Sequence, residues 1–426
     1  PICNDPRYQA YVEILKEELI PAMGCTEPIA LAYAAAKARE VLGVLPDSVQ
    51  LQVSGSIIKN VKSVIVPNTG HLKGMEAAVA AGIIAGSAEK ELEVISEVSE
   101  EKKSAIRDYL QTVPITIEHT EQGHVFDIVV TERCGQDYAR VRIADYHTNI
   151  CRIEKNGTVL YEVPLLDETV QEDARADRSL LNMQDIWDFA ETADLRDVAD
   201  LLERQIRYNN AIAEEGLLGD YGANIGRVLL TTYGNDVSNR AKAKAAAGSD
   251  ARMNGCELPV IINSGSGNQG ITCSVPLIEY AKELHSGKEK LYRALIISNL
   301  VAIHEKTGIG TLSAYCGAVS AGAGAGAGIV YLCGDGYQAA IHTVVNALAI
   351  VSGIVCDGAK ASCAAKIASS VDAALLGYNM YKCNQEFKGG DGIVMKDIET
   401  TIKGIGRLGK DGMRQTNEEI IRLMMS

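Results

Sequence analysis

The chain has 426 residues, 47% of them apolar, so it is long enough for two domains and a large buried core. Its net charge is −14 and its Lys and Arg residues are scattered. This excludes a nucleic-acid partner, because neutralising phosphates requires a basic face. No secretory signal opens the chain, and eleven cysteines without a dense framework fit a reducing compartment, so we expect a cytoplasmic protein.

Residues 1–88 combine helical and extended patterns. Pro21 ends a first amphipathic helix, and Thr26 is a good N-cap for a second helix that places Cys25 at its N-terminus. The expected elements are helices at residues 8–19, 27–42 and 74–86, a strand at 49–53, and an extended segment ending at 64–70. We expect this segment to pack with a catalytic domain formed by the later residues.

Residues 89–165 have a different hydrophobic pattern, with short runs in which apolar and polar residues alternate. They predict a small α+β domain with one helix. The helix is expected at residues 100–110 and the strands at 114–118, 125–131, 139–143 and 149–153. An acidic stretch at residues 167–177 reads as a connecting loop.

Residues 166–426 form the predicted catalytic domain, which is almost wholly helical from residue 185 onward. Residues 312–334 and 336–356 lack charged side chains and are long enough to span a bilayer. The first is dominated by Gly and Ala and the second carries several polar residues, so we interpret both as central helices of a soluble core and expect no membrane partner. The Ala-Gly alternation at residues 321–328 is expected to be a tightly packed helix, although each Gly costs about 1 kcal/mol of helix propensity.

The predicted fold class is therefore mainly α with an α+β portion. A Gly/Ala-rich helical domain would carry the site, beside a smaller domain that contains the strands. An acidic, helix-rich metabolic protein would assemble as a homodimer if it self-associates.

Three cysteines in the second half, Cys316, Cys356 and Cys363, lie in Gly/Ser/Ala-rich surroundings. Three thiolates without a fourth are what an iron–sulfur cluster with one open iron requires. The alternative is that they are small packing residues, which is how most cysteines behave. No C-x2-C pair exists, so the usual zinc and thioredoxin readings are excluded.

Cys25 is a second candidate, because a thiol at a helix N-terminus has a lowered pKa and can act as a base or a nucleophile. An inert cysteine in a helix-entry turn is the alternative. A third candidate is the loop at residues 263–270, whose glycines and following helix could cradle a carboxylate. Its polar side chains are Ser264, Ser266, Asn268 and Gln269. The spacing of its glycines matches G-x-G-x-x-G, but no βαβ unit surrounds it, so a dinucleotide site is not indicated and a plain helix–helix turn is the alternative.

The polar turn at residues 66–71 supplies the last candidates. Asn68 and Thr69 could contact a substrate and His71 could serve in acid/base chemistry, although a lone histidine in a turn is more often a surface residue. Lys306 and Lys360 raise a Schiff-base alternative, yet nothing near them supplies a phosphate cup or a partner for a pyridinium nitrogen. Pyridoxal phosphate is therefore not expected.

Four motifs spread along the chain carry a family resemblance. They are Gly24-Cys25-Thr26-Glu27-Pro28, Arg252-Met253-Asn254-Gly255, the 263–270 loop, and the segment from Cys356 to Cys363 that reads Cys-Asp-Gly-Ala-Lys-Ala-Ser-Cys. Together they resemble the oxygen-sensitive L-cysteine desulfidase family, whose relatives are the α regions of iron–sulfur L-serine dehydratases. The similarity covers nearly the whole chain and is weaker around His71 and in the middle segment.

The resemblance implies a [4Fe-4S] cluster held by Cys316, Cys356 and Cys363, with Cys25 as the catalytic base. The implied reaction is the breakdown of L-cysteine to pyruvate, hydrogen sulfide and ammonia. Cys25 would remove the Cα proton while sulfide leaves from Cβ, and the resulting aminoacrylate would tautomerise and hydrolyse. L-serine dehydration is the nearest alternative, and a non-catalytic metal-binding or sensor protein is the alternative from another class.

Overall fold

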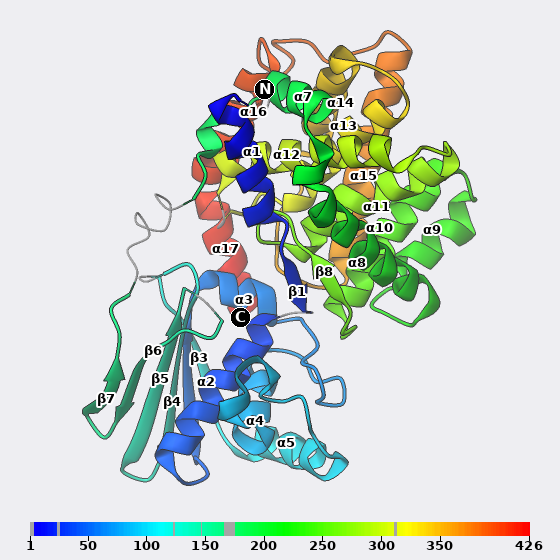
Figure 1. Cartoon of the computed structure of the whole chain (residues 1–426). Helices are drawn as coiled ribbons and strands as arrows, with labels where there is room; N and C mark the ends of the chain where they lie inside the picture. Colours follow the sequence, from blue (N-terminus) through cyan, green and yellow to red (C-terminus); the bar gives the residue numbers. More distant parts are fainter. Residues whose placement is uncertain (1–3, 24–25, 122–123, 146, 166–174, 311–312) are drawn as a thin grey trace. The chain divides into compact units, whose positions relative to one another are not determined.

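The computed structural model describes residues 4–23, 26–121, 124–145, 147–165, 175–310 and 313–426 (Figure 1). By its internal contacts the chain divides into two compact units. The helical unit comprises Pro1–Gly24, Asp173–Cys356 and Ala361–Glu419, and the sheet unit comprises Cys25–Glu172, Asp357–Lys360 and Ile420–Ser426. This division differs from the three expected segments, because residues 25–88 group with the strand-rich residues that follow them.

The sheet unit contains a six-stranded mixed sheet in the order β3-β2-β4-β5-β6-β7. Its elements are α2 (Thr26–Leu42), β2 (Ser48–Val53), α3 (Gly55–Val61), α4 (Met75–Ala85), a 3-10 helix (Ala88–Glu93), α5 (Glu100–Thr112), β3 (Ile115–His119), β4 (Asp127–Cys134), β5 (Asp137–Ala144), β6 (Ile150–Lys155) and β7 (Thr158–Glu162). Strand β2 runs parallel to β3, and the other neighbours are antiparallel. Because β2 lies between β3 and β4, its backbone hydrogen bonds tie the first 88 residues to the middle segment.

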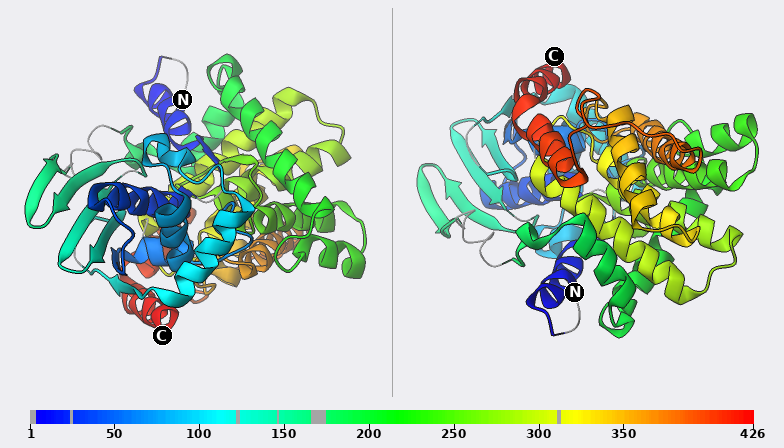
Figure 2. Two further views of the ribbon diagram at one scale, coloured as in Figure 1. Left: turned by 90° about the horizontal axis from the view of Figure 1, so that it is seen from below. Right: turned by 90° about the horizontal axis from the view of Figure 1, so that it is seen from above.

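The two faces of this sheet differ in chemistry. The apolar face, which includes Leu51, Val130 and Val141, is buried in one core with residues of α2 and α4. Figures 1 and 2 show the helices of this unit gathered on that side of the sheet. The other face carries charged pairs such as Arg142 with Asp127, joined at 2.7 Å. This alternation is what a period-2 pattern predicts for a half-covered sheet.

The helical unit contains the remaining elements. They are α1 (Pro6–Glu18), β1 (Pro21–Met23), 3-10 helices (Arg178–Leu180 and Leu195–Asp197), α7 (Met183–Thr192), α8 (Ala199–Leu218), α9 (Ile225–Tyr233), α10 (Val237–Met253), β8 (Pro259–Ile261), α11 (Gly267–Glu283), α12 (Lys288–Ile309), α13 (Gly317–Leu332), α14 (Tyr337–Val351), α15 (Ser362–Lys382), α16 (Ile398–Arg407), a π-helical turn (Leu408–Gly412) and α17 (Arg414–Met425), whose last residues group with the sheet unit. Strands β1 and β8 form a short antiparallel pair.

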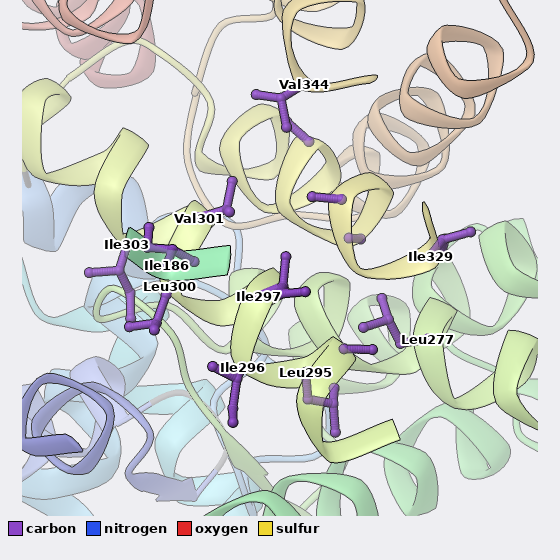
Figure 3. Packing of buried hydrophobic residues seen from close by; sticks show 14 of the residues in the cluster. Ile186, Leu277, Leu295, Ile296, Ile297, Leu300, Val301, Ile303, Ile329 and Val344 are labelled. Atoms are coloured by element: carbon purple, nitrogen blue, oxygen red, sulfur yellow. The ribbon is translucent and has the colours of Figure 1, made fainter. Parts of the chain in front are cut away.

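Helix α12 lies in the interior of the helical unit. Ten consecutive residues from Ala294 to Ile303 are buried, so the helix is covered on every side. Figure 3 shows Ile296 and Ile297 projecting from it in opposite directions into the surrounding core. A helix that is apolar all round predicts such a central position.

The Ala-Gly run forms the expected helix, α13, and its glycines permit close helix packing. A Cβ on Gly322 would lie 2.8 Å from the backbone of Ser370 in α15, and one on Gly324 would lie 2.5 Å from the carbonyl oxygen of Ser298 in α12. One turn later, a Cβ on Gly326 would lie 2.8 Å from Cβ of Ala374 in α15, and one on Gly328 would lie 2.9 Å from the carbonyl oxygen of Ala294 in α12. The backbones of α12 and α15 therefore contact α13 directly.

The structure differs from the predictions in a few elements. Residues 55–61, for which no element was predicted, form helix α3, and in the segment expected to be extended up to residues 64–70 Ile65 makes an isolated bridge with Lys73. The short strands β1 and β8 and the exposed edge strand β7 were not predicted. None of the helices in the described ranges combines the length and apolar character needed to cross a membrane.

Candidate functional site

A short antiparallel bridge in the helical unit brings Cys316 and Cys356 together. Tyr315 pairs with Val355, the Cys316 N–H donates to Ile354 O at 3.1 Å, and the Cys356 N–H donates to Ala314 O at 2.6 Å. Because side chains alternate along extended backbone, both cysteines point to the face opposite Tyr315. Diagonal neighbours in such a pair stand about 7–8 Å apart at Cα.

Cys363 joins them from the first turn of α15. Lys366 lies three residues later on the same helix, so the two side chains share one face. The Lys366 ammonium donates to Val355 O at 2.8 Å, which ties this face to the segment that carries Cys356. All three cysteines are half-buried.

The pKa of Cys316 is affected by the two other cysteines, as expected if all three lie close together. Burial and then the neighbouring Cys356 raise the pKa of Cys316 to about 11, with Cys363 adding to the rise and Lys366 opposing it. Cys316 therefore senses both other cysteines and the ammonium. Three thiols near one another resist joint ionisation unless a cation compensates them.

The spacing of these residues bears on which metal group fits. Throughout the described ranges, no three His, Cys, Asp or Glu side chains stand close enough to hold a single metal ion. A lone tetrahedral zinc holds its sulfurs about 2.3 Å from the metal and hence about 3.8 Å from one another. A cluster that carries iron at its corners holds its thiolates further apart than one ion does.

The 263–270 loop is a tight hairpin that leads into α11. Asn263 and Ser266 exchange backbone hydrogen bonds of 3.1 and 3.0 Å, and the two residues between them have positive φ, 51° at Ser264 and 76° at Gly265. This is the geometry of a type I′ turn. Ser266 then caps α11, its hydroxyl accepting from the Gln269 N–H at 3.3 Å.

Gln269 links this loop to the cysteines. Its Nε2 lies 2.3 Å from the point where a Cβ on Gly317 would stand, and Gly317 directly follows Cys316. The side chain is 5% exposed, and its Oε1 has no hydrogen-bond partner among the described residues. The loop and the first cysteine are therefore adjacent, with an unused buried acceptor beside them.

Arg252, at the end of α10, lies on the same loop. Its Nη1 donates to Asn268 Oδ1 at 3.4 Å, and its Nε lies 2.1 Å from where a Cβ on Gly267 would stand. Arg252 was predicted to have no role beyond its place in a family motif. The signal that could have singled it out is a cation next to a glycine-rich helix entry, and that proximity exists only in the fold.

A buried acid lies near the same helix ends. Both oxygens of Glu305, on α12, lack a hydrogen-bond partner in the described part of the chain, and the side chain is 2% exposed. Burial raises the pKa of Glu305 well above its usual range. Glu305 interacts electrostatically with Cys273 of α11 and with Tyr315, next to Cys316. No sequence pattern marked this residue.

The 66–71 turn belongs to the sheet unit, which is described separately from the cysteines. Thr69 is fully buried, and its hydroxyl donates to Val66 O at 2.8 Å and accepts from the Leu72 N–H at 3.2 Å. The Asn68 amide donates to Ile95 O at 3.0 Å. His71 is exposed and has a φ of 68°. The polar atoms of Thr69 and Asn68 are thus used within the turn and its surroundings.

Cys25 lies outside the described residues. The next residue, Thr26, begins α2, and its hydroxyl lies 2.9 Å from Nε2 of His147. The same His147 nitrogen lies 3.6 Å from Glu27 Oε1. The start of α2 is therefore polar, as its sequence predicts, and the role of Cys25 stays a prediction.

Comparison with known proteins adds an independent observation. Residues 89–422 match the family model described as serine dehydratase alpha chain. The chain belongs to this family. A dehydratase is a lyase, so membership in the serine dehydratase alpha chain family indicates lyase chemistry and bears out the resemblance.

Relatives match this member of the serine dehydratase alpha chain family along its whole length. A UPF0597 protein of Desulfitobacterium hafniense is 61% identical over 99% of this chain and 98% of its own. UPF0597 proteins of Lachnoclostridium phytofermentans and Clostridium perfringens are 52% and 37% identical, each over 98% of this chain and over 100% and 98% of their own. The family match includes Arg252, the 263–270 loop and the three cysteines, whereas Cys25 and the 66–71 turn precede it.

Proposed function

We propose that this protein is an iron–sulfur lyase that degrades L-cysteine to pyruvate, hydrogen sulfide and ammonia. The observation that carries the proposal is the meeting of Cys316, Cys356 and Cys363 in one unit, from segments up to 47 residues apart in sequence. Cysteines used only for packing have no reason to converge beside a polar loop. Membership in the serine dehydratase alpha chain family supports the same class of reaction.

These three cysteines would hold a [4Fe-4S] cluster. The fit rests on a soft sulfur-only donor set and on Lys366, whose charge offsets the thiolates. When bound, such a cluster supplies a Lewis-acidic iron that polarises the substrate. The backbone bridge at Tyr315 and Val355 holds two of the ligands in place before any metal arrives.

The protein's own residues would position the amino acid and move its protons. The 263–270 loop, with Ser264, Ser266, Asn268 and Gln269, would bind the polar groups of the substrate next to Cys316. Cys25 would accept the Cα proton, since its place before α2 favours the thiolate. The Cβ–sulfur bond breaks with its electron pair on sulfur, and water later converts the released aminoacrylate to pyruvate and ammonia. Asn68, Thr69 and His71 remain predicted contributors.

L-serine is the second candidate substrate, favoured by the printed description of the matching family. It differs from L-cysteine only in the leaving group, hydroxide in place of sulfide. The motif residues do not separate the two substrates, and we favour L-cysteine because the chain resembles the desulfidase branch more closely.

The decisive experiment is anaerobic reconstitution of the full chain with iron and sulfide. Iron and acid-labile sulfide should bind in cluster proportions, and L-cysteine should yield pyruvate and sulfide in equal amounts. Turnover of L-serine alone would replace the proposed substrate. A bound cluster without turnover of either amino acid would indicate a sensor or metal-binding protein instead.

Two variants assign the roles in the same assay. Cys25→Ala should keep the cluster absorption and lose sulfide release, and unchanged activity would remove Cys25 from the mechanism. Cys383→Ser is the matched control, because Cys383 is exposed at the far end of α15 and should change neither metal content nor rate.

A further inference from the structure

Arg252 has no acidic partner among the described residues. No carboxylate of these residues lies within ion-pair distance of it, and its Nε is buried without an acceptor. Arg178 contacts Glu17 and Glu18, and Arg240 contacts Glu279 and Glu283, whereas Arg39 and Arg204 resemble Arg252 in keeping a buried Nε without a partner in the described chain. A guanidinium has five donors, and within the described chain those of Arg252 reach Asn268 Oδ1 at 3.4 Å and Met253 Sδ at 3.9 Å. Its capacity to bind an anion is therefore unused.

The guanidinium lies against the first residue of a long helix. Its Nε and Cζ would stand 2.1 and 2.7 Å from a Cβ on Gly267, so the absence of a side chain there makes room for it. Helix α11 runs for 17 residues, and its first N–H groups form the positive end of the helix dipole. A cation with unused donors and a helix start thus share one point, which suits a carboxylate.

A buried acceptor lies in the same first turn of α11, two residues after Gly267. Gln269 Oε1 has no partner in the described chain, although the side chain is 95% buried (5% exposed). Leaving a buried amide oxygen unpaired costs about 1–3 kcal/mol, so such atoms usually serve a ligand or a water. The other end of this amide touches Gly317, the neighbour of Cys316.

We propose that Arg252 and the start of α11 bind the α-carboxylate of the substrate, and that Gln269 Oε1 accepts from its α-ammonium. This inference rests on the proposed function and names its substrate class as zwitterionic α-amino acids. The two anchors orient the amino acid with its side chain toward the cysteines. L-cysteine and L-serine share both charged groups. Arg252 and Gln269 would therefore select α-amino acids in general, and the residues that surround the substrate side chain would choose between L-cysteine and L-serine.

The test measures binding by calorimetry on the full chain, both reconstituted and without cluster, with ligands that cannot react. L-alanine has both charged groups, L-alaninamide lacks the carboxylate, and propionate lacks the ammonium. We expect L-alanine to bind about 10- to 100-fold tighter than L-alaninamide, the span of a charge-assisted hydrogen bond. Arg252→Met should erase this preference, and Arg252→Lys should keep part of it.

Gln269→Met should weaken L-alanine about tenfold and leave propionate unchanged, since the lost acceptor serves the ammonium alone. Gly267→Ala tests the same contact while keeping the side chains of Arg252 and Gln269. Its new methyl group should displace the Arg252 guanidinium and so also reduce the preference for a carboxylate. Arg227→Met is the control: Arg227 is exposed on α9 and its nearest acid, Asp220, is 4.0 Å away. It should bind all three ligands as the native chain does.

Equal affinity of the native chain for L-alanine and L-alaninamide would overturn the proposal, as would an unchanged preference in both Arg252→Met and Gly267→Ala. In the active enzyme, Arg252→Lys should raise KM for L-cysteine more than it lowers kcat. Absence of turnover with a retained carboxylate preference would instead contradict the proposed reaction and leave the amino-acid site standing.

Discussion

The 66–71 turn and the 263–270 loop look alike in sequence and differ in what they do with their polar atoms. Both are short, polar and glycine-containing, and both place non-glycine residues at positive φ, such as Asn68 and Ser264. In the first, the Thr69 hydroxyl makes two hydrogen bonds inside its own turn. In the second, Gln269 and the adjoining Arg252 keep buried polar atoms without partners in the described chain.

The difference shows how a structural turn can be told from a binding loop. Folding normally satisfies buried donors and acceptors, because each unsatisfied group costs stability. Thr69 follows that rule and needs no ligand. Gln269 Oε1 and Arg252 Nε break it at adjacent points, so a ligand is the simplest way to satisfy both.

The largest expected effect tests the site beside the loop. Cys316→Ser and Cys356→Ser should each reduce bound iron and turnover to background, because losing a metal ligand removes more than the 10- to 100-fold typical of an outer-shell partner. Iron analysis, visible absorption and pyruvate release measure the result. The Cys383→Ser chain should match the native one, and full iron in the Cys316→Ser chain would remove that residue from the ligand set.

The next effect concerns the backbone of the loop. A Cβ at Gly270 would lie 2.0 Å from the carbonyl oxygen of Ile261, so Gly270→Ala should lower the free energy of unfolding by about 3 kcal/mol. Gly265→Ala has no atom within 4 Å and should cost about 1 kcal/mol for its positive φ alone. Chemical denaturation of both variants measures the difference, and equal stabilities would show that α11 can shift away from β8.

Glu305 provides a second test of how unsatisfied buried groups affect stability, because both of its oxygens lack a partner in the described chain. Since burial raises its pKa in the folded protein, the folded state holds a proton that the unfolded state loses above about pH 4.5. Its contribution is therefore fully present below that pH and falls by about 1.4 kcal/mol per unit as the pH rises toward the folded pKa. Glu305→Gln removes this loss, so its melting temperature should exceed the native one by more at pH 8 than at pH 5. An identical difference at both pH values would mean that Glu305 is ionised and paired.

The smallest expected effect tests the turn. Thr69→Val keeps the shape but removes two hydrogen bonds, so stability should fall by about 1–2 kcal/mol while KM for L-cysteine stays the same. Thermal unfolding and steady-state kinetics give the two values. A raised KM at unchanged stability would assign substrate binding to this turn and erase the contrast with the 263–270 loop.

Local patterns predicted most elements, and tertiary context explains the exceptions. The sheet strands alternate and the segments that form α13 and α14 are free of charged residues, so β2 to β6 and these central helices were expected. Helix α3 was not predicted, because its β-branched residues Ile57, Ile58 and Val61 have low helix propensity, yet all three are buried there in the sheet unit's core. Strand β7 is exposed along its whole length and therefore lacks the alternation that marks a strand.

For the site, sequence could nominate residues but could not bring them together. Cys356 and Cys363 are near in the chain, whereas Cys316 reaches them through the pairing of Tyr315 with Val355, which no local pattern encodes. Arg252 stands in a family motif, but its distinguishing property is a buried Nε that lies against the first residue of α11 without an acceptor in the described chain. That property depends on the positions of all neighbouring side chains and has no signature in sequence.

Cys316 is the N-cap of helix α13, and α15 carries Cys363 in its first turn. Where these two helices contact each other, Gly322 packs directly against the main chain of Ser370. A single added methyl there would push the two helices apart and change the distance between Cys316 and Cys363. The spacing of these two cysteines is thus set by the side chain that Gly322 lacks, about two helical turns away from either of them.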